Sequence, residues 1–257
     1  MIGASERREW AEQGFFILRG FADRALTSAM WESIVAISRE KWGRFQPDES
    51  LVMPESNLAS DADVGDAKER LVSKVFRLHR EGVFRDFIDS APIVGISREL
   101  LEAEQVDCFL SQFIFKNPGA WGQPWHQDEY YFPFDRHPQV GFWLAVSEAT
   151  PENGCLHVLP GSHREPVHEH VPDRRPNANV GYVEIVDHDM TGAVSVLMDP
   201  GDLLVFHSRL MHGSTDNASS EPRATMVYHV AARGTVDNTG HSLVNDWMPI
   251  GDEVPVA

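Results

Sequence analysis

The chain has 257 residues, of which 42% are hydrophobic, and its 22 basic and 39 acidic residues give a formal net charge of −17. This length and composition suit a single large core, so we expect residues 1–257 to form one domain, a monomer or a homodimer. The acidic balance argues against nucleic acid or an anionic membrane as a partner. A charged N-terminus, no long apolar run, and two cysteines without disulfide or metal spacing favour a soluble cytoplasmic protein without a signal peptide.

The first part of the chain, to about residue 105, is predicted to be mainly helical. Capping residues and apolar spacing predict, in chain order, a short helix capped by Ser5 and ended by Gly14, a strand over 15–18, a helix from Asp23 to about Trp42, and a helix that begins at Ser90 and Pro92. Residues 46–69 are acidic, small and broken by Pro and Gly. They are expected to form a loop or a flexible lid.

The second part, about 106–232, reads as short alternating strands separated by Pro-Gly, Asn-Gly and Gly-Asp turns. This pattern predicts a mainly β protein with flanking helices, built on a double-stranded β-helix (jelly-roll, cupin-like) core. The strand near residues 107–119 alternates between two faces. Cys108, Leu110, Gln112, Ile114 and Lys116 are expected on one face, and Phe109, Ser111, Phe113 and Phe115 on the other. If the phenylalanines pack against the helices, Gln112 and Lys116 point into the barrel.

The segment WHQDEYYFPF places His126 and Asp128 two residues apart in what reads as an aromatic strand. Side chains at i and i+2 of a strand leave the same face. An imidazole and a carboxylate there supply two ligands of a 2-His-1-carboxylate site for non-haem Fe(II), which keeps positions open for oxygen chemistry. A hydrogen-bonded pair on a strand is the alternative.

A third ligand is available in GDLLVFHSRLMHGS, residues 201–214. The segment reads as a strand in which His212 shares a face with Leu204 and Phe206 and lies near the end. Such a histidine is also compatible with a plain core or turn role.

Arg223 opens the alternating strand RATMVYHVAA, eleven residues after His212, with Thr225 and Val227 on its face. A buried guanidinium without an anion pays a large desolvation penalty, so a carboxylate partner is expected. That partner is either a protein Asp or Glu, or a bound dicarboxylate held by the guanidinium fork.

These segments, together with GFWLAVSEATPENGCLHVLPGSH and PRATMVYHVA, resemble in order and spacing the phytanoyl-CoA dioxygenase family of Fe(II)/2-oxoglutarate oxygenases over about residues 105–232. The resemblance implies that His126, Asp128 and His212 bind iron, and that Arg223 with Ser214 holds the distal carboxylate of 2-oxoglutarate. It also places Lys116 and Trp143 in the cosubstrate pocket. Gln112 is a further cosubstrate candidate, and Gln127 and Tyr130 are candidates to contact the substrate.

The implied reaction is hydroxylation of an unactivated C–H bond of a small molecule. Fe(II) would be the cofactor, 2-oxoglutarate and O2 would be consumed, and succinate and CO2 would be released. Related halogenases lack the carboxylate ligand, so Asp128 favours hydroxylation. Three alternatives stay open. They are a 2-oxoglutarate-independent cupin-type dioxygenase or isomerase, a zinc hydrolase, and a non-catalytic jelly roll that binds a ligand.

Residues 163–192 form a long stretch rich in His, Pro and charge between two predicted strands. A loop of this length is unusual unless it is functional or disordered. His168, Glu169 and His170 suggest a second metal site, but they lack a third ligand nearby in the sequence. A solvated loop is therefore expected.

Overall fold

The computed structural model describes residues 2–42, 51–58, 64–237 and 245–251. The α-helices are α1 (Ala4–Gln13), α2 (Arg24–Glu40), α3 (Gly82–Ile88) and α4 (Ala91–Leu100). The strands are β1 (Phe15–Leu18), β2 (Val52–Pro54), β3 (Val72–Phe76), β4 (Val106–Lys116), β5 (Val140–Ala145), β6 (Leu156–Val158), β7 (His170–Pro172), β8 (Val183–Ile185), β9 (Val194–Val196), β10 (Leu203–His207), β11 (His212–Ser214), β12 (Arg223–Ala232) and β13 (Met248–Ile250).

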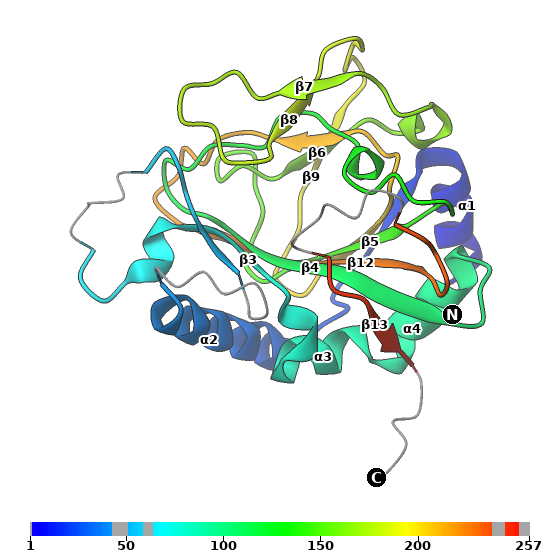
Figure 1. The fold of residues 1–257 in the computed structure, drawn as a ribbon, viewed down its shortest axis with the longest axis horizontal. Coiled ribbons are helices and arrows are strands. Elements are labelled where there is room, and N and C mark those ends of the chain that lie inside the picture. Colours follow the sequence, from blue (N-terminus) through cyan, green and yellow to red (C-terminus); the bar gives the residue numbers. More distant parts are fainter. Residues whose placement is uncertain (1, 43–50, 59–63, 238–244, 252–257) are drawn as a thin grey trace.

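The predicted jelly-roll core is confirmed (Figure 1). An eight-stranded sheet has the order β1-β10-β5-β12-β4-β3-β2, with β13 also paired to β4. A smaller sheet, β11-β6-β9, faces it, and β7 and β8 form a separate antiparallel pair beyond the small sheet (Figure 1). In the parts of the chain described, no helix has both the length and the apolar character needed to cross a membrane.

Helices α2, α3 and α4 cover the face of the large sheet that points away from the small one (Figure 1). Their buried side chains, such as Met30, Phe84 and Ile93, pack in one cluster with Phe113 of β4 and Tyr228 of β12. Burial of such side chains contributes about 1.5–3 kcal/mol each relative to exposure. This face anchors the large sheet and leaves the opposite face free to line a cavity.

The inner face of the large sheet packs against the small sheet. Trp143 and Phe206 from the large sheet meet Leu156 and Val158 from the small one. Gly141 of β5 is required here, because a Cβ at this position would collide with the ring of Phe206. The glycine lets that ring lie flat over the sheet.

Alternation along β4 is interrupted, which corrects one expectation. The register between β4 and β12 shifts at His229 and Val230, so that Leu110 pairs with His229 but Cys108 pairs with Val230. An extra residue in one strand reverses the side-chain parity beyond it. Cys108 therefore packs with the helix-side core, while Phe109 packs with Leu110 in a separate cluster. Residues 112–116 keep the predicted faces.

Other expectations need smaller corrections. The first helix begins at Ala4 with Gly3 as its N-cap, so Ser5 lies inside the helix rather than capping it; its C-cap, Gly14, adopts the predicted left-handed conformation. Asp23 caps α2 as predicted by accepting a hydrogen bond from the Leu26 N–H, and the helix ends at Glu40. The strand β3 and the helix α3 were not predicted.

Two segments expected to be loops contain regular structure. Within residues 46–69 the chain forms β2 and enters a 3-10 turn at Lys68, while the expectation for 46–50 and 59–63 lies outside the described residues. Residues 163–192 contain the β7–β8 pair. The expected continuous strand over 201–214 is instead β10 and β11, which belong to different sheets because the chain turns over between His207 and His212.

Candidate active site

Two histidines far apart in the sequence are joined by their backbones. The His126 N–H donates to the His212 carbonyl at 2.8 Å, and the His212 N–H donates to the His126 carbonyl at 3.0 Å. This reciprocal pair forms an isolated antiparallel bridge and leaves the ring centroids 4.2 Å apart. The bridge therefore holds the two imidazoles side by side, at the edge of a cavity between the two sheets.

Each imidazole is oriented by a second hydrogen bond. His126 Nδ1 lies 2.8 Å from the Pro124 carbonyl, and His212 Nδ1 lies 2.9 Å from the Leu210 carbonyl. A carbonyl only accepts, so Nδ1 carries the proton in both rings and Nε2 presents a lone pair. Metal-ligating histidines usually donate their second ring N–H to a carbonyl or a carboxylate in this way, which sets the orientation of the ring.

Asp128 completes the cluster. Its Oδ1 lies 3.5 Å from His126 Nε2 and 3.7 Å from His212 Nε2. The three side chains are buried, and their ligand atoms lie within 4.8 Å of one another. The structure thus brings together the three residues predicted as a triad.

The route by which Asp128 reaches the cluster differs from the expectation. Asp128 begins a 3-10 turn, Asp128–Tyr130, and the segment is paired only through two isolated bridges, His126 with His212 and Phe134 with Asp237. The segment is therefore a loop with a bridge near each end rather than an aromatic strand. The proximity of His126 and Asp128 comes from the turn, not from strand alternation.

The charges of the cluster suit a cation. Burial opposes ionisation of Asp128, but His212, His229 and His126 together hold its pKa far below the usual range. Burial, with His126 nearby, lowers the pKa of His212 to about 4. At neutral pH the site therefore offers a carboxylate and a neutral imidazole, the forms in which these side chains bind metals.

A pair of cations lies across the cavity from this cluster. Lys116 at the end of β4 and Arg223 at the start of β12 are directly opposed in the antiparallel register. Both are buried, with 3% and 2% of their surface exposed. Lys116 Nζ donates to Ser214 Oγ and to the Thr215 carbonyl, both at 2.6 Å. Burial and the neighbouring Arg223 lower the pKa of Lys116 well below its ordinary value.

Arg223 lacks the anion that a buried guanidinium requires. Within the described residues, its Nε and Nη1 have no hydrogen-bond partner, and no Asp or Glu interacts with it. Its closest aromatic contact is Trp143, whose ring centroid is 5.4 Å from Cζ. Burial lowers its pKa to about 10, which leaves it charged at neutral pH. The possibility of a protein carboxylate partner is thereby removed for the described chain.

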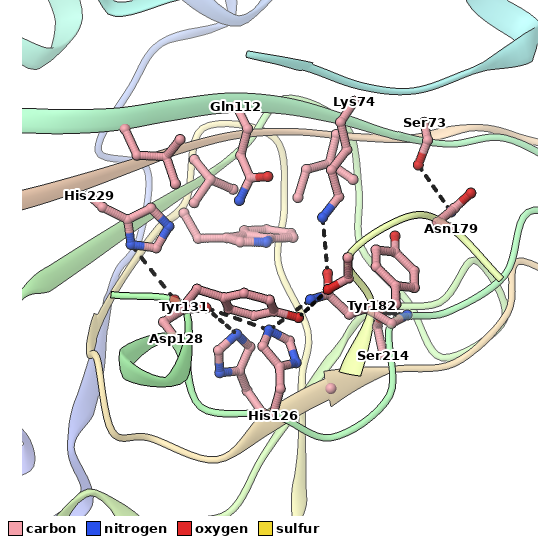
Figure 2. A pocket seen from close by; sticks show the side chains of 18 of the residues that line it. Ser73, Lys74, Gln112, His126, Asp128, Tyr131, Asn179, Tyr182, Ser214 and His229 are labelled. Carbon is pink, nitrogen blue, oxygen red and sulfur yellow. Dashed lines mark hydrogen bonds and ion pairs between the residues drawn. The ribbon is translucent and has the colours of Figure 1, made fainter. Parts of the chain in front are cut away.

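The His-Asp cluster and the cation pair line one cavity of about 660 Å³ between the sheets. Figure 2 shows Gln112 and Lys74 entering it from the large sheet, opposite His126 and Asp128. Trp143, Ser214 and Gln112, predicted for the cosubstrate pocket, are among its lining residues. Tyr130 lies at its rim, 41% exposed, where it stacks on His170.

Gln127 does not line the cavity, in contrast to the expectation that it contacts substrate. Its amide Nε2 donates to the carbonyls of Pro166 and Arg209, and its Oε1 accepts from the His168 N–H at 2.8 Å. The Gln127 side chain points away from the cavity and toward residues 163–192, because the chain turns at Asp128. Gln127 therefore positions its neighbours, His126 and Asp128.

Among the cavity residues missed from the sequence are Lys74, Tyr131 and His229. His229 is two residues beyond Val227 on the inward face of β12, so strand alternation was sufficient to find it. Lys74 belongs to the unpredicted strand β3. Tyr131, rather than Tyr130, faces His126 because of the 3-10 turn, and its hydroxyl donates to the Gly181 carbonyl at 2.9 Å.

The donor set fits a divalent transition metal. Two imidazoles with free Nε2 lone pairs and one carboxylate are a ligand set for Fe(II), and also for zinc. In the absence of a metal, the amide nitrogen of Gln123 lies 3.0 Å from His126 Nε2. The unpartnered atoms of Arg223 fit a carboxylate ligand in the same cavity.

The chain belongs to the phytanoyl-CoA dioxygenase family, whose sequence model matches residues 10–225. Phytanoyl-CoA dioxygenase of Bos taurus, a peroxisomal protein by its name, is 30% identical over 213 residues, which cover 68% of this chain and 63% of that protein. Phytanoyl-CoA dioxygenase 1 of Oryza sativa subsp. japonica is 30% identical over 185 residues, which cover 70% of this chain and 65% of that protein. The chain thus spans a little under two thirds of the length of these two relatives.

Among solved structures, EvdO2 from Micromonospora carbonacea var. aurantiaca superposes with a TM-score of 0.69 at 26% identity, covering 93% of this chain and 94% of EvdO2. A second structure of EvdO2, complexed with 2-oxoglutarate, superposes with a TM-score of 0.68. The likeness covers both the helical layer and the jelly roll.

Proposed function

We propose that this protein is an Fe(II)- and 2-oxoglutarate-dependent dioxygenase that hydroxylates an unactivated C–H bond of a small molecule. The observation that carries the proposal is buried Arg223 beside Lys116: within the described residues its Nε and Nη1 have no partner, and it shares a cavity with the His-Asp-His cluster. Membership of the phytanoyl-CoA dioxygenase family supports the same reaction class.

In this proposal His126, Asp128 and His212 hold the iron. When bound, the iron would supply the activation of O2 that couples oxidative decarboxylation of 2-oxoglutarate to oxidation of the substrate. The balanced reaction converts 2-oxoglutarate, O2 and R–H into succinate, CO2 and R–OH. The bridge between His126 and His212 holds two of the ligands in place through backbone hydrogen bonds.

Arg223 would bind the distal carboxylate of 2-oxoglutarate with its unpartnered Nε and Nη1. Lys116, supported by Ser214, would add a second positive charge on the same side. Trp143 lies against the guanidinium and keeps water from it. A 2-oxoglutarate-independent dioxygenase or isomerase has no use for this pair of buried cations, so the pair favours the 2-oxoglutarate-dependent reaction.

Residues outside the cosubstrate region would receive the substrate. Among the described lining residues, Lys74 is the one Lys or Arg that remains once Lys116 and Arg223 are assigned. It is buried, and among the described residues its ammonium has one hydrogen-bond acceptor, Gln123 Oε1 at 3.1 Å, and lies 4.8 Å from the ring centroid of Tyr182. The buried Glu55 carboxyl interacts with this ammonium electrostatically but forms no hydrogen bond to it, so the ammonium can still pair with an anionic group of a substrate. Apolar side chains such as Phe132 and Leu110 suit the rest of that molecule.

The proposal is tested without a known substrate by adding 2-oxoglutarate to the anaerobic Fe(II) protein and recording the visible charge-transfer absorption. Binding is expected in the wild type and much weakened in Arg223→Ala. Arg209→Ala is the matched control, because Arg209 pairs with Glu129 at 2.8 Å and does not line the cavity. If the iron-loaded protein neither binds 2-oxoglutarate nor forms succinate from it in air, the 2-oxoglutarate-independent alternative replaces this proposal.

A further inference from the structure

A second group of metal-ligating side chains lies outside the active site, at the open end of the β7–β8 pair. Glu165 and His168 precede β7, and His188 follows β8 (Figure 1). Their ligand atoms all lie within 4.8 Å of one another. The sequence concealed this group because its third member, His188, is separated from the other two by the whole hairpin.

The three side chains converge on one carboxylate oxygen. Glu165 Oε2 lies 3.0 Å from His168 Nε2 and 3.1 Å from His188 Nε2. Ligand atoms around a tetrahedral zinc ion with bonds of about 2.0–2.1 Å are about 3.3 Å apart. The spacing in the cluster is close to that value, so a small ion requires only a slight expansion.

His168 is clamped between two carboxylates, which is the second observation that points to a cation. Its Nδ1 lies 3.2 Å from Asp187 Oδ1, while its Nε2 faces Glu165. A neutral imidazole has one N–H, so only one of these nitrogens can donate and the other directs a lone pair at a carboxylate oxygen. A second proton on the ring removes that repulsion, and so does a metal ion between His168 Nε2 and Glu165, which leaves Nδ1–H to donate to Asp187. Carboxylate–histidine–metal arrangements of this kind are usual around bound zinc.

His188 supports the same arrangement. Among the described residues, its Nε2 contacts Glu165, and its Nδ1 is buried without a hydrogen-bond partner. The orientation of this ring is therefore set by the cluster. The side chains of His168 and His188 are 16% and 21% exposed, so an ion can reach them from solvent. The carboxylates of Glu165 and Asp187 supply the negative charge that attracts a divalent cation.

We propose that Glu165, His168 and His188 form a second, structural metal site that takes a zinc-like divalent ion, with water completing the coordination and Asp187 orienting His168. The ion would close the β7–β8 pair at its base. It would also brace the active site, because the His168 N–H donates to Gln127 Oε1 and His170 Nε2 accepts from the Gln127 N–H. Gln127 lies between His126 and Asp128.

The test measures metal binding rather than activity. A variant with the iron site removed, His126→Ala with Asp128→Ala, is stripped of metal and titrated with Zn²⁺ in competition with a chromogenic chelator. One equivalent per chain is expected. His188→Asn or Glu165→Gln in the same background should abolish binding, and Asp187→Asn should weaken it about 10- to 100-fold. His157→Asn is the matched control, because within the described chain the ring of His157 in β6 has a single hydrogen-bond partner, the Ser195 hydroxyl, and lies outside the cluster.

Stoichiometry in the wild-type background provides a second measurement if the iron-site variant fails to fold. The wild type should bind two zinc equivalents, and His188→Asn one. Zinc should also raise the unfolding temperature of every chain that retains the cluster by more than it raises that of His188→Asn. The proposal is overturned if the iron-site variant binds no zinc, or if His188→Asn binds as much zinc as the His157→Asn control.

Discussion

Lys116 and Arg223 are directly opposed on neighbouring strands, so two cationic side chains are buried together on the inner face of the large sheet. In the described chain no carboxylate offsets the charge of Arg223. Like charges placed opposite each other destabilise a sheet. The arrangement is therefore one that a dicarboxylate ligand would stabilise.

Arg223→Ala should raise the apparent KM for 2-oxoglutarate by about 100-fold or more, because loss of one partner of a buried charge pair costs about 3–5 kcal/mol. The KM for the prime substrate should change little. Steady-state succinate formation measures both constants. An unchanged KM for 2-oxoglutarate in a folded Arg223→Ala protein would reduce Arg223 to a structural role.

Replacing any one of His126, Asp128 and His212 with Ala should greatly weaken Fe(II) binding or abolish turnover without unfolding the jelly roll. The backbone bridge between His126 and His212 does not depend on their side chains, so the fold should persist. Iron content and circular dichroism measure the two effects separately. Full activity in His212→Ala would show that the third ligand is another residue.

Lys74→Met should stabilise the substrate-free protein by about 1 kcal/mol, since a buried ammonium with one neutral acceptor is replaced by an apolar side chain. The same change should weaken turnover of an anionic substrate while the KM for 2-oxoglutarate stays constant. Denaturant unfolding measures the first effect. A destabilised Lys74→Met protein would indicate that the ammonium has a structural function, and Lys68→Met on the neighbouring 3-10 turn serves as the control.

Chloride should not enter the product. Asp128 occupies the ligand position that halogenases of this family leave without a carboxylate, so hydroxylation should dominate even with abundant chloride. Mass spectrometry of the product decides between the two outcomes. A chlorinated product from the wild type would refute both the role of Asp128 and the hydroxylation step. Asp128→Gly need not become a halogenase, because chloride also requires suitable surroundings.

Acid should destabilise the protein partly through His207. Burial, with His163 and Arg209 nearby, lowers the pKa of His207 from 6.5 to about 3. The unfolded chain binds a proton in that window and the folded chain does not, so stability is full above about pH 6.5 and falls as the pH drops toward 3. By pH 4 the loss should be about 3 kcal/mol.

His207→Asn keeps an acceptor for the Arg209 N–H, which now donates to His207 Nδ1 at 3.0 Å, but cannot take up a proton. Its unfolding free energy should depend less steeply on pH than that of the wild type. Urea titrations at several pH values between about 4 and 7 measure this slope. Equal slopes would assign the acid sensitivity to other groups.

The triad was assigned through the family resemblance, whereas strand alternation and residue chemistry were enough to predict the jelly roll and the inward positions of Lys116 and Arg223. These features depend on local periodicity, which the sequence displays directly. The triad was nevertheless predicted for an incorrect reason, because Asp128 reaches His126 through a 3-10 turn. Motif spacing identified the residues even though it misjudged their backbone.

What escaped prediction depends on tertiary contacts. The bulge in the β4–β12 pairing exchanges the faces of the sheet on which Cys108 and Phe109 lie, and the pattern of apolar residues does not indicate it. Lys74 was missed with its short strand, and His188 joins Glu165 only after the hairpin folds. The direction of Gln127 is set by its bonds to the 163–192 segment, which no local signal reveals.

The bridge between His126 and His212 uses peptide groups that every residue except proline possesses on both sides. Its two hydrogen bonds therefore place any pair of side chains at the rim of the cavity, whatever their chemistry. A protein designer can exchange the imidazoles for other donors and alter the preferred metal while the supporting frame stays the same. The position of the metal ligands and their chemical identity are therefore set by different parts of the chain, the first by backbone hydrogen bonds and the second by side chains.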